Sequence, residues 1–589
     1  MPLFVVMLTA ALAMRIFVLQ EVAYEALNCR WCVVPGILRA DIPLLSFCLW
    51  MFLISFLPLN RFLAIPLKAM TLAGVLIYVA DILVMSQFFT RLRLADARIY
   101  LQQISIVMRH LTTFPWWKLG LAALFLALIV FLCVAVPKKK LSWRSFIMGT
   151  AALTGLSLTA QYAIPYPMVV HDWAIRNIIS TNLESGLERD YAPSTRDTWL
   201  REDPPLTSST SCLPGKNRQP HIVLLILESW SPYHSAYWSG LNNWTPRLDK
   251  LAREAMSFMR FHAGGFSTND GLVSLFTGKD FILPIKYAHQ SEPFDSAWGL
   301  PATLPRALVG KGYQAAFLTS GNLEFSRKGE WLRDIGFSYI EGHDHPDYNG
   351  IPRQHFDSVP DEFLYGRALN YIFEQVEDSR PALTAIESVS SHHPFVHPYT
   401  KERDEEAVFR YVDDSAADFI ENLIRRGFLD HGIILVISDH RAMTPVSKKE
   451  HDRLGRSASS LIPAFVVQRE AKKQAVYHLF HQADLLPSIL RQIEEGEFCW
   501  RGAVRDLFEP EVSQPRCVMH SRGDVRHHVD IFCAEGSGTA KVRGDNSVFI
   551  DTQGLDAEKQ RMLLDTIAWE RIRTDAQSRA VTASRRPGE

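Results

Sequence analysis

Long apolar runs mark the first 170 residues. Five of them reach the roughly 18 residues that a helix needs to cross a bilayer: 3–20, 42–59, 71–89, 119–136 and 146–170. A bundle of buried helices in a soluble protein is the alternative, but five such runs in so short a stretch favour five transmembrane helices. Arg15 interrupts the first run. Asp81 lies in the middle of the third and must face the bundle interior or a partner.

Beyond residue 190 the hydrophobic pattern changes. Polar, loop-forming residues up to about 220 indicate a linker, and shorter apolar runs of strand length follow at 221–227, 432–438 and 461–467. Helical patterns lie between these runs, at 245–256, 361–377 and 412–427. Such alternation predicts an α/β domain with a central, mostly parallel sheet and helices on both faces.

After residue 500 the elements become shorter. Two strands, 529–533 and 548–551, precede a helix at about 556–573 and a polar tail. We therefore divide the chain into a transmembrane domain, a linker and interfacial segment, an α/β domain, a small C-terminal α+β subregion and a disordered tail. Their predicted bounds are 1–170, 171–220, 221–500, 501–575 and 576–589.

Composition describes the whole chain poorly. The 589 residues hold 62 Lys and Arg against 63 Asp and Glu, a net charge of −1, and 48% are hydrophobic. These values exclude a disordered chain and argue against a nucleic-acid binder. Up to residue 170, however, 14 basic and 5 acidic residues give +9, whereas the remainder holds 48 and 58, giving −10.

Basic loops indicate the orientation. The connection between the fourth and fifth spans, 138–144, holds four basic residues and belongs in the cytoplasm. The fifth helix then delivers everything after about residue 171 to the outer face of the plasma or inner membrane. The loop between the third and fourth spans is also basic but falls outside, where its pattern suits interfacial helices. An oxidising outer compartment permits disulfides, and Cys517 could pair with Cys533.

Polar side chains follow two of the predicted strands. Glu228 ends the first strand, and Asp439 and His440 follow the second. In open parallel sheets ligands bind beyond the carboxyl ends of the strands, so these residues could converge. Two carboxylates and an imidazole suit a divalent ion such as Mn²⁺, Zn²⁺ or Mg²⁺. The alternative is that Glu228 caps a helix and the Asp-His pair forms a turn.

A candidate nucleophile lies in the segment 264–278. Two glycines lead into a short polar stretch, and a helix then runs to Gly278. Ser267 or Thr268 would stand at the helix N-terminus, where backbone N–H groups favour an anion. A hydroxyl bound to a metal at this point could attack phosphorus. A plain N-cap residue is the other interpretation, and position alone does not separate the two.

Six motifs occur in a characteristic order: Leu227-Glu228-Ser229, residues 244–251, the Thr268 segment, Ser391-His392-His393-Pro394-Phe395, Ser438-Asp439-His440 and residues 482–490. Over roughly 220–495 the chain resembles the lipoteichoic acid synthase and phosphoglycerol transferase branch of the alkaline phosphatase and sulfatase superfamily. The resemblance implies an alkaline-phosphatase-like fold. It also implies one metal ion, commonly Mn²⁺, bound by Glu228, Thr268, Asp439 and His440.

The same resemblance implies substrate-binding residues. His392 matches a histidine that binds the glycerophosphate group, and a shift of the match by one position would select His393 instead. Arg327 resembles a substrate-binding arginine. Leu323 stands where some relatives carry histidine, and Arg441 where aromatic residues are usual. The resemblance therefore does not determine which headgroup is transferred. His481 could be an extra ligand or phosphate contact, although a surface histidine is the simpler interpretation.

We therefore expect a membrane-anchored enzyme that transfers phosphoglycerol from phosphatidylglycerol to a glycan or polymer acceptor of the cell envelope, through a phosphothreonine-type intermediate. Phosphoethanolamine transfer and hydrolysis of phosphate or sulfate esters are the alternatives. The Cys/Ser-x-Pro-x-Arg motif of sulfatases is absent around Thr268, which disfavours sulfate esters. A protein that binds lipid or polymer without catalysis is a third hypothesis, and no nucleic-acid partner is expected.

Overall fold

The computed structural model describes residues 2–27, 33–58, 61–88, 91–94, 141–164, 175–185, 191–204, 210–280, 302–378, 380–469, 472–522 and 527–584, with isolated positions between them. The chain divides into two compact units. The first, the N-terminal unit, comprises residues 1–186 with 444–448; the second, the C-terminal unit, comprises 187–443 with 449–589.

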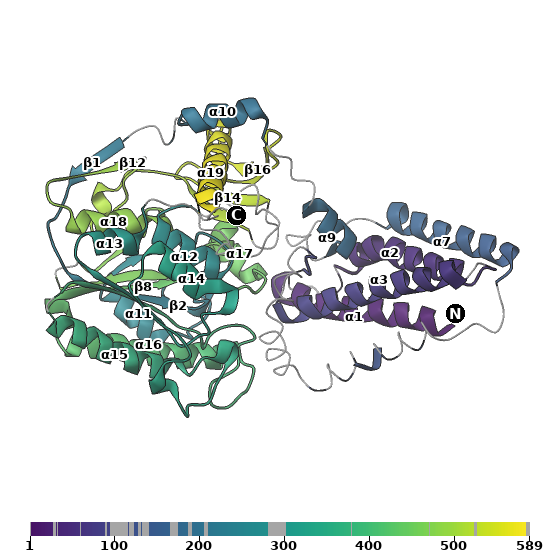
Figure 1. Ribbon diagram of the computed structural model, residues 1–589, viewed down its shortest axis with the longest axis horizontal. Helices are drawn as coiled ribbons and strands as arrows, with labels where there is room; N and C mark the ends of the chain where they lie inside the picture. The colour runs from purple at the N-terminus through teal and green to yellow at the C-terminus, as the bar shows by residue number, and fades with distance from the viewer. Residues whose placement is uncertain are drawn as a thin grey trace. The chain divides into compact units, whose positions relative to one another are not determined.

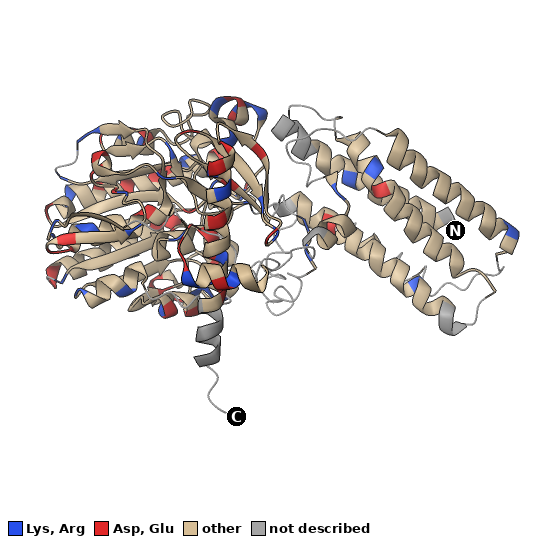
Figure 2. Ribbon diagram, turned by 90° about the horizontal axis from the view of Figure 1, so that it is seen from above, with Lys and Arg blue, Asp and Glu red and all other residues tan. Residues whose placement is uncertain are grey.

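The N-terminal unit is built from helices: α1 (Pro2–Leu27), α2 (Val34–Ile54), α3 (Arg61–Phe88), α7 (Trp143–Ala163) and α9 (Ile178–Ser185) (Figure 1). Few charged residues mark α1, α2, α3 and α7 (Figure 2). Within the described ranges, three helical stretches are long and apolar enough to cross a membrane: Leu3–Gln20, Val34–Ile54 and Ala64–Ser86.

The predicted count of five spans is therefore not confirmed. The fourth predicted span, 119–136, lies outside the described residues except for isolated positions. The fifth forms α7, but polar residues such as Thr150, Thr154 and Gln161 lower its mean hydropathy, and it is not among the three. The second span begins earlier than predicted, at Val34, because a proline in the first helical turn favours a helix start there.

Charged side chains lie inside the N-terminal unit. Nε of Arg15 is 2.6 Å from Oδ2 of Asp41, and its Nη1 is 3.2 Å from Oδ2 of Asp81. Arg91 binds Asp81 at 2.6 Å, and the Tyr78 hydroxyl donates to Asp41 at 2.9 Å. All five residues are buried. The prediction that Asp81 faces the bundle interior is thus confirmed, and Arg15 is accommodated by the same ion pairs.

A mixed eight-stranded sheet forms the centre of the C-terminal unit. In spatial order its strands are β10 (Gln474–Val476), β3 (Met256–Phe258), β9 (Ala464–Val467), β8 (Gly432–Ser438), β2 (His221–Leu227), β7 (Ala382–Glu387), β5 (Gln314–Thr319) and β6 (Tyr339–Glu341). Five of the seven neighbouring pairs are parallel. Strand β9 runs antiparallel to both of its neighbours, so the predicted mostly parallel sheet contains one reversed strand.

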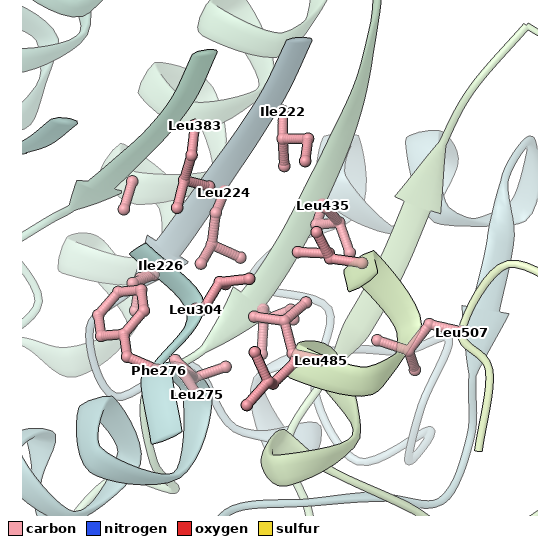
Figure 3. Close-up of a cluster of buried hydrophobic side chains, with 14 of the residues drawn as sticks. Ile222, Leu224, Ile226, Leu275, Phe276, Leu304, Leu383, Leu435, Leu485 and Leu507 are labelled. Carbon is pink, nitrogen blue, oxygen red and sulfur yellow. The ribbon is translucent and has the colours of Figure 1, made fainter. Parts of the chain in front are cut away.

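Strand β2 is apolar on both faces because helices cover both. Ile222, Leu224 and Ile226 belong to one core layer, with side chains from α12 (Thr268–Thr277), α13 (Leu304–Gly310), α14 (Lys328–Ile335) and α18 (Leu485–Ile493) (Figure 3). The alternate residues of β2 belong to the other layer, with α11 (Pro246–Arg253), α15 (Asp361–Glu377) and α16 (Glu405–Arg425). Each buried aliphatic side chain contributes about 1.5–3 kcal/mol to folding.

The region after residue 500 forms the predicted small α+β subregion. Its four-stranded antiparallel sheet comprises β13 (Val518–Ser521), β14 (His528–Phe532), β15 (Ser537–Lys541) and β16 (Val548–Gln553). Helix α19 (Ala557–Ser584) continues through most of the predicted disordered tail. Buried Asp575 of this helix lies 3.2 Å from Arg196 of α10 (Pro193–Arg201), which holds the helix beyond its predicted end.

Two disulfides tie the C-terminal unit together. Cys517 is bonded to Cys533, as predicted. Cys212 is bonded to Cys499, 287 residues away, which the sequence does not reveal. The second bond joins β1 (Thr210–Pro214) to its antiparallel partner β12 (Glu497–Arg501), so part of the predicted linker is a strand.

Candidate active site

The candidate site lies at the carboxyl ends of β2 and β8. These neighbouring parallel strands pair Leu227 with Ser438, so the residues that follow, Glu228 and Asp439, emerge side by side. Both are buried, as is His440. One ligand atom from each of Glu228, Asp439 and His440 lies within 4.8 Å of the others. The sequence prediction that these three residues converge is therefore confirmed.

The two oxygens of Asp439 have different surroundings. Oδ1 accepts hydrogen bonds from the backbone N–H groups of Ser229 and His440, both at 2.8 Å. Oδ2 is buried, has no hydrogen bond within the described part of the chain, and lies 3.2 Å from Nε2 of His440. Because buried polar atoms are nearly always paired, this oxygen fits a ligand for a cation.

His440 presents one nitrogen to the same point. Its Nδ1 lies 2.7 Å from the carbonyl oxygen of Arg441, which can only accept, so Nδ1 carries a proton. Its Nε2 faces oxygens of Asp439 and Glu228, at 3.2 and 3.5 Å. A backbone carbonyl that accepts from Nδ1 is a usual arrangement for a histidine that binds metal through Nε2. These hard oxygen and nitrogen donors fit a divalent cation.

The charges in the group are coupled. Burial alone would raise the pKa of Glu228, but its hydrogen bond with His440 and the charge of His392 lower it. Burial and the Glu228 carboxylate raise the pKa of Asp439. Burial alone would lower the pKa of His440, but Asp439 and Glu228 raise it well above its usual value. Two carboxylates this close require positive charge, which a divalent cation would also supply.

The hydroxyl of Thr268 joins this group from the first turn of α12. Its Oγ1 donates to Oε2 of Glu228 at 3.1 Å and lies 3.3 Å from Nε2 of His440. Ser267 is the N-cap residue of the helix, and the Asp270 carboxylate accepts from its backbone N–H at 3.2 Å. The sequence left open whether the hydroxyl at this helix start is an N-cap or a nucleophile. In the structure Ser267 caps the helix, and Thr268 faces the carboxylates.

His392 lies near the group, in the loop after β7. Its charge lowers the pKa of Glu228, and the Ser391 hydroxyl before it donates to the Glu228 carbonyl oxygen at 2.6 Å. The His392 ring packs edge-on against Phe356 with centroids 4.7 Å apart. His393 instead contacts the ring of Phe395. Of these two candidate histidines, His392 is the one whose charge lowers the pKa of Glu228.

Arg327 and Lys328 differ in their surroundings. The Arg327 side chain is 55% exposed and binds Glu330 on the surface. The Lys328 side chain is 14% exposed, and its Nζ lies 2.7 and 2.9 Å from the two oxygens of Glu387. Glu387 ends β7 and pairs in register with Ile226, two residues before Glu228. The sequence analysis missed this ion pair, although Glu387, like Glu228, is an acidic residue that ends an apolar strand.

Two further residues have structural partners. His481 is buried, so the expectation of a surface histidine is wrong; its Nε2 donates to the Met519 carbonyl, and its Nδ1 accepts from the Ala483 N–H, both at 3.0 Å. The buried Arg441 guanidinium binds Glu450 of α17 (Lys448–Leu454) at 2.7 and 2.9 Å. Arg441, which replaces the aromatic residue that is usual at this position, therefore forms an ion pair inside the domain.

Comparison with known proteins identifies the fold. The sequence model of the sulfatase family matches residues 220–494. A solved alkaline phosphatase superfamily protein from Vibrio parahaemolyticus is 17% identical, with a TM-score of 0.52 over 69% of this chain and all of that chain. The lipoteichoic acid synthase LtaP from Listeria monocytogenes is 18% identical, with a TM-score of 0.48 over 62% of this chain and 93% of that chain. Residues 220–494 therefore match the sulfatase family model, and this part of the chain has an alkaline-phosphatase-like fold.

Proposed function

We propose that the protein is a membrane-anchored phosphotransferase that moves a phosphoglycerol headgroup from phosphatidylglycerol to a glycan or polymer acceptor. The observation that carries this proposal is the Thr268 hydroxyl, 3.1 Å from Glu228 and 3.3 Å from His440 within a buried group of metal-ligand type. The order of motifs from Leu227 to residue 490 supports phosphoglycerol as the group transferred.

Glu228, Asp439, His440 and Thr268 would hold one divalent ion, for which we propose Mn²⁺. Oxygen and imidazole donors also suit Zn²⁺ and Mg²⁺, so metal identity is part of the test. When bound, such an ion lowers the pKa of a coordinated hydroxyl and offsets negative charge on phosphoryl oxygens.

The residues of the chain suit a two-step displacement. In the first step, the Thr268 oxygen attacks the phosphorus of the donor diester, the bond from phosphorus to the diacylglycerol oxygen breaks, and diacylglycerol leaves with a proton. In the second, an acceptor hydroxyl attacks the phosphothreonine diester, and Thr268 regains its proton as its bond to phosphorus breaks. We assign His392, whose charge lowers the pKa of Glu228, the role of binding the headgroup or moving these protons.

The outer face of the plasma or inner membrane is the location that we propose for the C-terminal unit. Three apolar helices in the described part of the chain precede it, and all four of its cysteines form disulfides. Structural disulfides persist in oxidising compartments and are rare in the cytosol. A multi-pass anchor would keep the site at the surface of the bilayer that contains the phospholipid donor.

Hydrolysis is the second candidate, because the matched family is that of the sulfatases. Water would then replace the acceptor in the second step, and glycerol phosphate would be released. Threonine at 268, in place of the cysteine or serine from which sulfatases form formylglycine, favours a phosphate over a sulfate ester.

Turnover of a labelled lipid tests the proposal. Purified full-length protein with Mn²⁺ and fluorescent phosphatidylglycerol should release fluorescent diacylglycerol, and Thr268→Ala should abolish the release. Thr277→Ser, at the other end of α12, is the matched control and should retain activity. Release by Thr268→Ala at the wild-type rate would refute the assignment. Fluorescent phosphatidylethanolamine tests the other headgroup, and free glycerol phosphate among the products would indicate hydrolysis.

A further inference from the structure

We infer that Gln482 is a positioning residue that fixes the nucleophile segment against the metal-binding loop, an inference that rests on the proposed function. Gln482 lies in the short 3-10 turn η9 (Gln482–Asp484) and is completely buried. Its Oε1 accepts from the backbone N–H of Gly264 at 2.8 Å. Its Nε2 donates to the carbonyl oxygens of Ser438 and Asp439, at 2.9 and 2.6 Å.

One amide group thus joins two segments that are far apart in the sequence. Gly264 belongs to the segment that leads into α12 and Thr268, whereas Ser438 ends β8 and Asp439 follows it. The partners fix the orientation of the amide, because Gly264 N can only donate and the two carbonyl oxygens can only accept. Both amide hydrogens and the amide oxygen are therefore used.

The same junction is tightly packed. A Cβ atom added to Gly271, on α12, would lie 2.1 Å from the carbonyl oxygen of Asp439 and 3.2 Å from Nε2 of Gln482. Helix α12 therefore packs directly against the backbone of Asp439, with the Gln482 amide beside the contact. Any loss of the amide hydrogen bonds would act on the spacing between Thr268 and Asp439.

Gln482 is itself held in place by its neighbours. His481 donates to the Met519 carbonyl through Nε2 and accepts from the Ala483 N–H through Nδ1. Asp484 accepts from the His481 N–H at 2.8 Å. In β13, Nδ1 of His520 lies 3.0 Å from the Ala263 carbonyl oxygen. The segment before Thr268 thus contacts both Gln482 and strand β13.

These contacts assign Gln482 an indirect role. Its amide acts on Thr268 through Gly264 and on the metal-binding carboxylate through the Asp439 backbone. Substrate binding should therefore depend little on Gln482, whereas the rate of the chemical step and the affinity for the metal ion should depend on it. Residues that orient metal ligands typically affect either quantity by 10- to 100-fold.

Gln482→Met tests this role in the full-length protein, because methionine has a similar length but makes no amide hydrogen bonds. We expect about a tenfold or larger fall in kcat with fluorescent phosphatidylglycerol, a KM within about twofold of wild type, and Mn²⁺ binding weakened about tenfold. Gln492→Met is the matched control, because Gln492 is buried on α18 and its Nε2 has no hydrogen bond within the described part of the chain.

Melting curves establish that each variant is folded at the assay temperature. If Gln482→Met does not fold, Gln482→Asn, which keeps the amide on a shorter side chain, is measured in its place with the same expectation. Unchanged kcat and Mn²⁺ affinity in a folded variant would overturn the inference, as would a rise in KM with kcat unchanged. If wild type does not turn over the lipid, the proposed function fails, but the Mn²⁺ titrations still decide the role of Gln482.

Discussion

The backbone N–H of Ser229 donates to Oδ1 of Asp439 at 2.8 Å, whereas Oδ2 of the same carboxylate lacks a hydrogen bond in the part of the chain that the structure describes. Asparagine at 439 would keep the first contact and replace the second oxygen by an amide nitrogen, which does not bind metal ions. Burial and the Glu228 carboxylate already raise the pKa of Asp439, so the neutral side chain should be tolerated.

We therefore expect Asp439→Asn to melt at the wild-type temperature in EDTA but to lose the stabilisation that Mn²⁺ gives wild type. A ligand at 100 times its Kd stabilises the folded state by about 2.7 kcal/mol, which a melting curve detects readily. Asp413→Asn is the control and should keep the Mn²⁺ shift, because Asp413 is not one of the candidate metal ligands. Its carboxylate accepts from the backbone N–H groups of Arg247 and Leu248, at the start of α11. A full Mn²⁺ shift in Asp439→Asn would contradict the ligand assignment.

Substitutions at the adjacent positions Lys328 and Arg327 should have different effects on turnover. Lys328→Met would leave the buried Glu387 carboxylate without its partner. Burial, together with the nearby charges of Glu228 and Asp439, raises the pKa of Glu387. We expect turnover of phosphatidylglycerol to fall about tenfold or more, because breaking a buried ion pair is strongly unfavourable. Arg327→Met should retain turnover within about twofold, because exposed ion pairs contribute little. The reverse order of effects would support the prediction that Arg327 binds the substrate.

The sequence predicts the strand-end residues of the site but not the contacts between distant segments. Strands β2 and β8 are continuous apolar runs, so the positions of Glu228 and Asp439 follow from hydrophobicity and the geometry of parallel sheets. Ser267 and Thr268 are adjacent hydroxyl residues at one helix start, and the structure is needed to show which faces Glu228. Nothing local separates them, because both positions suit a helix N-terminus.

Residues that act through tertiary contacts escape prediction for the same reason. Gln482 and His481 resemble ordinary polar residues of a loop. The partners of the Gln482 amide lie in the segment before α12 and at the end of β8, and His481 bonds to Met519 of β13, about 40 positions further along the chain. Strand β1 lies in a segment rich in proline and serine, and its pairing with β12 becomes visible only when Cys212 and Cys499 are brought together. In the N-terminal unit, Asp41 lies just outside the predicted second span but inside the observed helix.

Because Arg15 and Asp41 form an ion pair, removing both charges should destabilise the protein less than removing the charge of Asp41 alone. The four charged residues of the cluster, Arg15, Arg91, Asp41 and Asp81, sum to zero. Asp41→Leu would leave one buried positive charge in excess, which typically costs roughly 3–5 kcal/mol. Arg15→Leu combined with Asp41→Leu restores the balance and leaves Arg91 bound to Asp81. We therefore expect the double variant to melt at a higher temperature in detergent than the single variant Asp41→Leu.

Exposed Arg144, near the start of α7, provides a control: Arg144→Leu removes one charge outside the cluster and should leave the melting temperature unchanged. A double variant no more stable than Asp41→Leu would mean that the charges of Arg15 and Asp41 are not balanced against each other.

His481 predicts how the stability of the fold depends on pH. Burial lowers the pKa of His481 to about 3, whereas the unfolded chain should protonate this residue near its usual value of 6.5. A depressed histidine pKa stabilises the folded state fully above pH 6.5, and that stability is lost as the pH falls towards 3. Each pH unit in this window costs about 1.4 kcal/mol, because the unfolded chain gains a proton that the folded chain excludes.

His481→Asn removes this titration and should make the loss of stability in acid shallower, even though the hydrogen bond to Met519 is also lost. Chemical unfolding at several pH values, followed by tryptophan fluorescence, measures the slope directly. The slope should not vanish, because burial also holds the pKa of His262 well below its usual value. Exposed His478 gives the matched variant, His478→Asn, whose slope should equal that of wild type. If His481→Asn showed the wild-type slope as well, acid sensitivity would have to arise from other groups, with His262 the first to replace.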